Sequence, residues 1–171
     1  MESFGEATFQ GNPLTVIGPR LKVGDSAPAF SLLANDLGAV ALSDSAGKVR
    51  LISVVPSLDT PVCDLQTRTF NRQLDALGDG VAGYTVSADL PFAQARWCGA
   101  AGVARMKTLS DHRDMSFGDA YGTHIKELRL EARAVFVVDA AGVIQYVEYV
   151  PEVTNAPDYD AALAAVKALL G

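Results

Sequence analysis

The stretch "VRLISVVPSLDTPVC" (residues 49–63) joins a long apolar run to a predicted helix start. Residues 49–56 are almost continuously apolar and end at Pro56, a pattern typical of a strand that is buried on both faces. Strands of this kind lie at the centre of sheets whose faces are covered by helices. We therefore expect an α/β protein with residues 49–56 as a central strand.

A helix is predicted directly after this strand. Asp59 or Thr60 can serve as its N-cap, and Pro61 suits the first helical position because the N–H that proline lacks would be unpaired there. Apolar side chains then recur at helical spacing until Gly78, which is expected to end the helix. Strand and helix together make the first half of a β-α-β unit.

The rest of the chain alternates strand and helix patterns and closes with a strand pair and a helix. Further strands are expected at 39–44, 81–89, 106–111, 133–139 and 143–150, and further helices at 91–98, 114–122 and 158–170. Residues 7–19 predict an N-terminal β-hairpin. This order predicts a thioredoxin-like fold with a mixed central sheet flanked by helices. Because no linker interrupts the chain, we expect residues 1–171 to form a single domain.

The composition excludes several classes of partner. The chain has 171 residues with a formal net charge of -6, which does not favour binding to nucleic acid or to an anionic membrane. It contains no apolar run long enough for a transmembrane helix, and its acidic N-terminus does not match a secretory signal. We expect a cytoplasmic protein.

Cys63 would be the third residue of the helix that starts at Pro61. Its sulfur would lie beside unpaired backbone N–H groups and the positive end of the helix dipole, which favours the nucleophilic thiolate form. The hydroxyl of Thr60 could donate a hydrogen bond to the sulfur or to an approaching oxygen, and Pro56 would shield the sulfur from water. The same pattern also fits a buried structural cysteine behind an ordinary helix cap.

Cys98 is the second of two cysteines. Its distance from Cys63 along the chain excludes a C-x-x-C redox motif, and the two cysteines and two histidines lack the spacing of a zinc site. His112 and His124 suggest no Cys–His pair, so we expect them to be structural or on the surface. The sequence predicts no metal and no cofactor.

The segment "PSLDTPVC" (56–63) fits the peroxiredoxin pattern P-x-x-x-T-x-x-C, with Pro56, Thr60 and Cys63 in its fixed places. The wider chain resembles the bacterial thiol peroxidase subfamily of atypical 2-Cys peroxiredoxins. The segments that carry this resemblance are "FQGNPLTVIGPRLKVGDSAPAFSL", "SVVPSLDTPVCDLQTRTFN", "DLPFAQARWCGA", "LEARAVFVVD" and "PDYDAALAAVKALL", which together span nearly the whole sequence.

The resemblance implies a role for each candidate residue. Cys63 would be the peroxidatic cysteine, which attacks a hydroperoxide and becomes a sulfenic acid, and Arg133 would sit beside it. A guanidinium is always charged and carries five donors, so it can stabilise the thiolate and the charge that develops on the leaving oxygen. Without the resemblance, Arg133 would be interpreted as a solvated charge at the start of a strand.

The resemblance also implies how the cycle closes. Cys98 would be the resolving cysteine, forming an intrachain disulfide with Cys63 that thioredoxin then reduces. We expect disulfide formation to unwind one or both helix ends locally, because the two sulfurs need not lie within bonding range. The subfamily favours alkyl hydroperoxides over hydrogen peroxide and forms a homodimer through the face near the active site.

Two other functions remain possible from the residues alone. A cysteine hydrolase would need a base paired with its nucleophile, and neither histidine is placed for that role. A non-enzymatic thioredoxin-fold module would keep both cysteines as structural thiols. A peroxidase is distinguished from both because it loses two thiols per chain when it meets a hydroperoxide.

Overall fold

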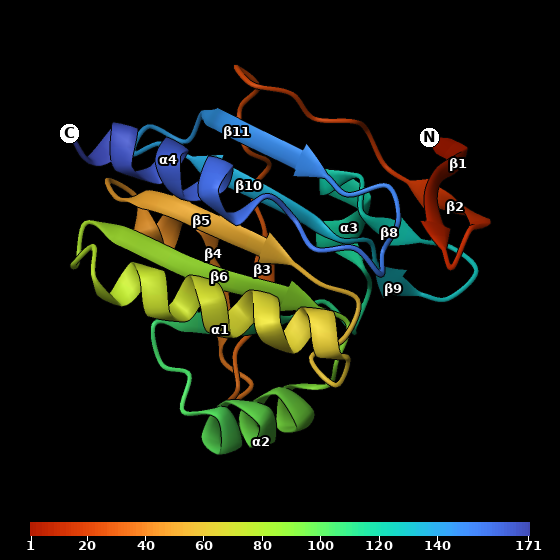
Figure 1. Ribbon diagram of the computed structural model, residues 1–171, viewed down its shortest axis with the longest axis horizontal. Helices are drawn as coiled ribbons and strands as arrows, with labels where there is room; N and C mark the ends of the chain where they lie inside the picture. The colour runs from red at the N-terminus through yellow and green to blue at the C-terminus, as the bar shows by residue number, and fades with distance from the viewer.

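The computed structural model describes residues 1–171 and is built on a seven-stranded mixed sheet (Figure 1). The strand order is β11-β10-β5-β6-β7-β3-β4, in which the neighbours β5–β6 and β6–β7 pair in parallel and all other neighbours pair antiparallel. The strands are β3 (Ser31–Leu33), β4 (Ala39–Ala41), β5 (Val49–Val54), β6 (Val81–Ser87), β7 (Met106–Ser110), β10 (Ala134–Val138) and β11 (Ile144–Tyr149). Every residue of β5 is buried, so the predicted central strand is confirmed.

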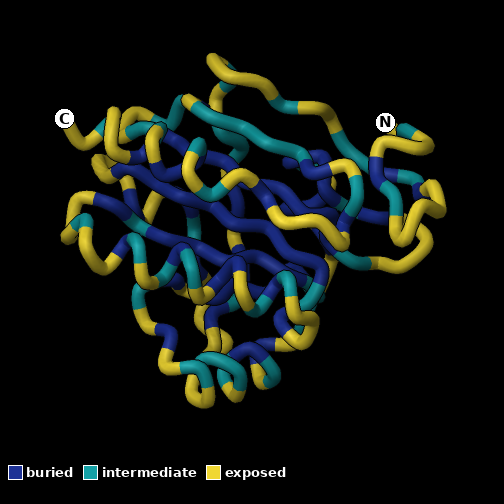
Figure 2. The backbone as a smooth tube through the Cα atoms, in the orientation of Figure 1, coloured by how far each residue is buried: buried dark blue, intermediate teal, exposed yellow.

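Two helices cover one face of this sheet, namely α1 (Pro61–Asp75) and α4 (Tyr159–Leu170). Side chains of β5 alternate between the two faces: Leu51 packs with Phe70 of α1 and Leu163 of α4, whereas its neighbour Ile52 points to the opposite face. The helix α2 (Pro91–Ala101) lies at the side of the molecule and packs against β7. Figure 2 shows the buried strands running through the centre of the molecule between these layers.

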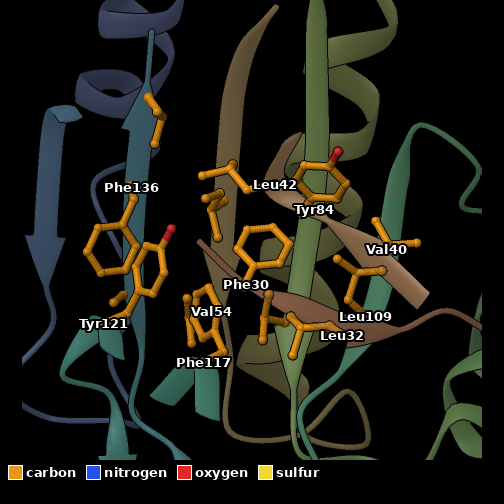
Figure 3. Packing of buried hydrophobic residues seen from close by; sticks show 14 of the residues in the cluster. Phe30, Leu32, Val40, Leu42, Val54, Tyr84, Leu109, Phe117, Tyr121 and Phe136 are labelled. Carbon is orange, nitrogen blue, oxygen red and sulfur yellow. The ribbon is translucent and has the colours of Figure 1, made fainter. Parts of the chain in front are cut away.

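An aromatic cluster fills the opposite face of the sheet (Figure 3). Phe117 and Tyr121, both on α3 (Ser116–Tyr121), stack with ring centroids 4.1 Å apart, and Phe30 and Phe136 meet Tyr121 edge to face. Stacked and edge-to-face pairs of this kind add to the stabilisation that burial gives. The short helix α3 is thereby held against the sheet.

A second sheet, of order β1-β2-β8-β9, stands at one end of the molecule. Its strands are β1 (Glu2–Phe9), β2 (Asn12–Ile17), β8 (His124–Ile125) and β9 (Leu130–Glu131). The predicted N-terminal hairpin is confirmed as β1 and β2, joined through Gln10 (φ 51°) and Gly11 (φ 81°). Two successive residues with positive φ match the type I′ turn that suits tight hairpins.

Two predicted boundaries were wrong. The helix α2 does not end at Cys98 but continues to Ala101, because Gly102 adopts the left-handed conformation (φ 68°) that terminates it. The strand expected over 39–44 ends at Ala41, and residues 42–45 form a 3₁₀ turn. The Asp44 side chain accepts a hydrogen bond from the Ala41 N–H (2.9 Å), which closes this turn instead of extending the strand.

Candidate active site

Cys63 is the third residue of α1 and its side chain is completely buried. It forms a small apolar cluster with Val55 and Leu58, against which Trp97 packs. The backbone of Thr60 is extended (φ -103°, ψ 148°) and Pro61 follows as the first helical residue. The local rules for helix starts therefore place the sulfur in the first turn of α1, close to the positive end of its dipole.

The guanidinium of Arg133 reaches Cys63 from the start of β10. Its Nη2 lies 3.3 Å from the sulfur of Cys63, and its Nη1 donates to Oε1 of Gln66 at 2.9 Å. Nε and Nη2 both donate to the carbonyl of Val153, at 2.9 and 2.7 Å. Arg133 is only 2% exposed, so the solvated charge that local sequence patterns alone would suggest is wrong.

No carboxylate pairs with this buried cation. The acceptors around Arg133 are a carbonyl, an amide oxygen and the sulfur of Cys63, and of these the sulfur is the one that can take a negative charge. A buried charge is costly unless an opposite charge and hydrogen bonds compensate it. The arrangement therefore favours a thiolate at Cys63 as the counter-ion of Arg133.

Gln66 was not predicted from the sequence as a site residue. It is fully buried, and its Nε2 donates to the hydroxyl of Ser53 on β5 at 2.7 Å, which turns Oε1 towards Arg133. Its position three residues after Cys63 puts both side chains on one face of α1. That spacing, together with a polar amide on the helix face that is buried, is the signal that could have identified Gln66.

Thr60 and Pro56 lie in the loop that leads into α1. Thr60 is the N-cap residue of α1, one of the two that were predicted, but its hydroxyl donates to the carbonyl of Ser57 at 2.9 Å and makes no hydrogen bond to the helix N–H groups. Because this bond uses the hydroxyl proton, its oxygen keeps lone pairs that can accept a further hydrogen bond. Pro56 is buried directly after the end of β5.

Asp89 holds this loop in place, a role that the sequence did not suggest. Its carboxylate accepts hydrogen bonds from the hydroxyl of Ser57 (2.8 Å), the N–H of Leu58 (2.9 Å) and the hydroxyl of Ser87 (2.7 Å). The loop before Cys63 is thus tied to the end of β6 by charge-assisted bonds. A shallow hollow of about 300 Å³ lies over the first turn of α1, lined by Leu58, Asp59, Thr60, Pro61, Asp64 and Trp97.

Cys98 occupies a different environment on α2. Its sulfur is half-buried, lies 3.3 Å from the hydroxyl of Thr108 on β7, and borders a separate cavity of about 460 Å³. Both cysteines are free thiols in this structure. Cys63 contacts Arg133 whereas Cys98 contacts Thr108, so the two sulfurs have separate partners in this structure.

The two histidines lie outside this site. Nδ1 of His124 pairs with Asp119 at 2.7 Å, and the backbone carbonyl of His112 accepts a hydrogen bond from Arg129. No cluster of three or more His, Cys, Asp or Glu side chains could hold a metal ion. No helix is both long and apolar enough to cross a membrane.

Comparisons with known proteins give the family of this chain. The redoxin family matches residues 22–163. Thiol peroxidase of Halalkalibacterium halodurans is 64% identical over 163 residues (95% of this chain, 98% of the relative), and thiol peroxidase of Bacillus subtilis is 59% identical over 165 residues (96% and 98%).

Among solved structures, a peroxiredoxin-like protein from Aquifex aeolicus superposes with a TM-score of 0.88 at 41% identity, covering 95% of this chain and 96% of its own. Thiol peroxidase from Chromobacterium violaceum gives a TM-score of 0.85 at 26% identity over 95% of each chain. The chain belongs to the redoxin family and, within it, to the bacterial thiol peroxidases, which are enzymes of the peroxiredoxin type.

Proposed function

We propose that Cys63 is the peroxidatic residue with which this thiol peroxidase reduces hydroperoxides. The observation that carries the proposal is the buried guanidinium of Arg133, which has no carboxylate partner and lies 3.3 Å from the sulfur. This contact favours the thiolate, and the thiolate is the nucleophilic form of cysteine. The position of Cys63 in the first turn of α1 acts in the same direction.

The chemical step is a displacement at oxygen. The thiolate of Cys63 attacks the terminal oxygen of the hydroperoxide, an S–O bond forms, and the O–O bond breaks. The leaving oxygen takes up the electron pair and a proton and departs as water or an alcohol, while Cys63 becomes a sulfenic acid. Arg133 stabilises the charge that develops on the leaving oxygen, and the free lone pairs of Thr60 accept a hydrogen bond from the hydroperoxide. Pro56 keeps solvent away from the sulfur.

Cys98 completes the cycle as the resolving residue. Its thiolate attacks the sulfur of the sulfenic acid, an S–S bond forms, and the oxygen leaves as water. Because the two sulfurs have separate neighbours in the dithiol form, this step follows a local opening of α1 or α2. A dithiol protein, thioredoxin, then reduces the disulfide by exchange. This chemistry suits the cytoplasm, where such systems keep thiols reduced.

The family resemblance supports a preferred substrate class and a homodimer. Organic hydroperoxides are the preferred substrates and hydrogen peroxide is a weaker one. The protein acts as a homodimer whose interface lies near the active site. Leu90 and Phe92, at the start of α2, are 52% and 66% exposed, and an interface there would cover this apolar surface.

Thiol counting with cysteine variants tests the proposal. Reduced protein should lose two thiols per chain on adding one equivalent of cumene hydroperoxide, without any intermolecular band on a non-reducing gel. Cys98→Ser should still be oxidised at Cys63, which intact mass would show as one added oxygen, but should not be recycled by thioredoxin. Cys63→Ser should lose peroxidase turnover, and full turnover in this variant would refute the proposal.

A further inference from the structure

The connection between β11 and α4 supplies the carbonyl that holds Arg133. The Val153 oxygen accepts two hydrogen bonds from the guanidinium, at 2.9 and 2.7 Å. One of the two donors is Nη2, the same nitrogen that contacts the sulfur of Cys63. The position of the Val153 carbonyl therefore fixes the direction in which Nη2 points.

This connection is fastened to the N-terminal hairpin by backbone hydrogen bonds. The N–H of Thr8 donates to the carbonyl of Pro151 at 2.7 Å, and the N–H of Val153 donates to the carbonyl of Thr8 at 2.9 Å. The Val153 side chain is buried in the apolar cluster formed with Ala7 and Leu14 of the hairpin. The hairpin thus determines where the Val153 carbonyl lies. Figure 1 shows the hairpin, β1 and β2, at the end of the molecule beyond β8 and β9.

Glu152 makes the third attachment, through its side chain. Its carboxylate accepts hydrogen bonds from the Gly11 N–H (2.8 Å), the Gln10 N–H (3.1 Å) and the Thr8 hydroxyl (2.9 Å). Both turn residues have positive φ, and successive N–H groups in such turns form concave sites for anions. The N–H and hydroxyl of Thr154 complete the set at 3.0 and 2.7 Å.

The charge state of Glu152 agrees with this role. Burial opposes its ionisation, but the hydrogen bonds from Gly11, Thr154 and Thr8 outweigh that effect and lower its pKa to about 2. The side chain is therefore a carboxylate at neutral pH, the form that charge-assisted hydrogen bonds favour.

We propose that Glu152 is a positioning residue for the peroxidase reaction. Its carboxylate fastens the hairpin turn to the segment that contains Val153, and the carbonyl of Val153 in turn directs the guanidinium of Arg133 towards Cys63. The N-terminal hairpin then belongs to the architecture of the active site, although none of its residues touches the sulfur. This inference rests on the roles proposed for Arg133 and Cys63.

The test compares Glu152→Ala with Glu127→Ala. The carboxylate of Glu127 also accepts from the hairpin, at the Thr15 N–H (3.1 and 2.9 Å), but it lies in the turn between β8 and β9 and has no link to Val153. A displacement of about 1 Å in a positioning group can cost up to about 100-fold in rate. For Glu152→Ala we expect the rate constant for oxidation of Cys63 by cumene hydroperoxide to fall about 10- to 100-fold in single-turnover measurements. The pH profile of Cys63 alkylation should move to higher pH, Glu152→Gln should recover part of both losses, and Glu127→Ala should behave as the wild type.

Three results separate the possible failures. Wild-type rate and pH profile in folded Glu152→Ala would overturn the proposal. An equal loss in Glu127→Ala would also overturn it, because the effect would then not be specific to Glu152. If Glu152→Ala does not fold, Thr8→Val serves in its place, because it removes one donor to the carboxylate and keeps the side-chain shape. Its oxidation rate should fall in the same direction but by less than in Glu152→Ala. An unchanged rate would overturn the proposal. If Arg133→Lys itself reacts at the wild-type rate, the role proposed for Arg133 fails and the positioning role fails with it.

Discussion

Arg133 contacts several groups from different parts of the chain. Its planar fork serves three partners at once, the carbonyl of Val153, the amide of Gln66 and the sulfur of Cys63. Lysine would retain the charge, but a single ammonium on a flexible chain cannot reach acceptors spread around a guanidinium plane. The planar geometry of the guanidinium, in addition to its charge, brings the donor Nη2 to the sulfur.

We therefore expect Arg133→Lys to react with cumene hydroperoxide about 100-fold more slowly than the wild type, because a preorganised donor at the reacting oxygens is lost. Stopped-flow oxidation of the reduced protein would measure this. The matched control is Arg50→Lys, since Arg50 is also buried (3% exposed) but binds the hydroxyl of Ser45 and the carbonyl of Asp139, away from Cys63. A comparable loss of rate in both variants would contradict the specific role of Arg133.

Glu131 is another buried ionisable residue, and it lies outside the proposed mechanism. Burial first, and then the neighbouring Asp111, raise its pKa well above the usual value. Its Oε2 accepts from the hydroxyl of Thr123, while Oε1 has no hydrogen-bond donor. A proton on Glu131 would supply a donor towards Asp111, whose own oxygens accept the N–H groups of Phe117 and Gly118. The surroundings of Glu131 at the base of α3 thus favour its neutral form.

This environment predicts a pH-dependent stability. An acid whose pKa is raised on folding stabilises the native state fully below its unfolded pKa, and that contribution is lost as pH rises towards the folded pKa. As pH rises above the ordinary pKa range of a glutamate carboxyl, the free energy of unfolding should therefore fall. Glu131→Gln, which stays neutral, should flatten this slope and be more stable than the wild type at the alkaline end, as urea unfolding at several pH values would show. Glu127→Gln, at an exposed carboxyl, should keep the wild-type slope.

At the scale of elements, local patterns predicted what depends on local chemistry. The cap residue, the proline and the apolar spacing of α1 all lie within the segment that they determine, so its start and the place of Cys63 were predictable. The strands β8 and β9 have two residues each and exist only because they pair with distant segments, so no periodicity revealed them.

Contacts between distant elements were accessible only through the family resemblance, or not at all. Arg133 approaches Cys63 because β10 pairs with β5, and no pattern near residue 133 indicates this. The Val153 acceptor is a backbone carbonyl, which any residue type supplies, so the sequence could not mark it. Gly99 and Gly102 both follow Cys98 and could each end α2, and it is Gly102 that adopts the left-handed conformation.

The link between α1 and α2 yields a prediction at this scale. The indole N–H of Trp97 donates to Asp64, the residue after Cys63, at 2.8 Å. This bond exists in the dithiol form and must break if the first turn of α1 moves towards Cys98. Hydrogen bonds to charged groups contribute about 1.5–3 kcal/mol. With partial exposure reducing that value, we expect Trp97→Phe to form the disulfide about 3- to 10-fold faster than the wild type.

Faster resolution leaves less sulfenic acid available for a second oxidation. Intact mass after treatment with increasing hydroperoxide should therefore show less sulfinic acid in Trp97→Phe than in the wild type. Arg96→Gln, at an exposed position of α2 next to Trp97 in sequence, serves as the control and should match the wild type. More sulfinic acid in Trp97→Phe would show that the indole bond promotes resolution instead of restraining it.

Across the whole molecule, the two cysteines lie away from the main cores. Two large apolar clusters, one on each face of the central sheet, hold β5, β6 and β10 with α1 and α4. Cys63 belongs instead to a cluster of three buried residues, and α2 buries only Pro91 and Gln94. Segments with few buried contacts open at lower free energy than the core. The segments that carry the two cysteines can therefore rearrange while the sheet remains intact.

Hydrogen exchange on the reduced and oxidised proteins tests this division. In the oxidised form, amides in the first turn of α1 and in α2 should exchange faster, because the disulfide proposed between Cys63 and Cys98 would draw the two sulfurs away from their present partners, Arg133 and Thr108. Amides of β5, β6 and β10 should keep their protection, since their apolar contacts do not involve either sulfur. The variant Cys98→Ser, oxidised to the sulfenic acid alone, should retain the reduced pattern. Equal protection of α1 and α2 in both redox forms would mean that the sulfurs meet without unwinding, and loss of protection throughout the sheet would mean that the opening is global.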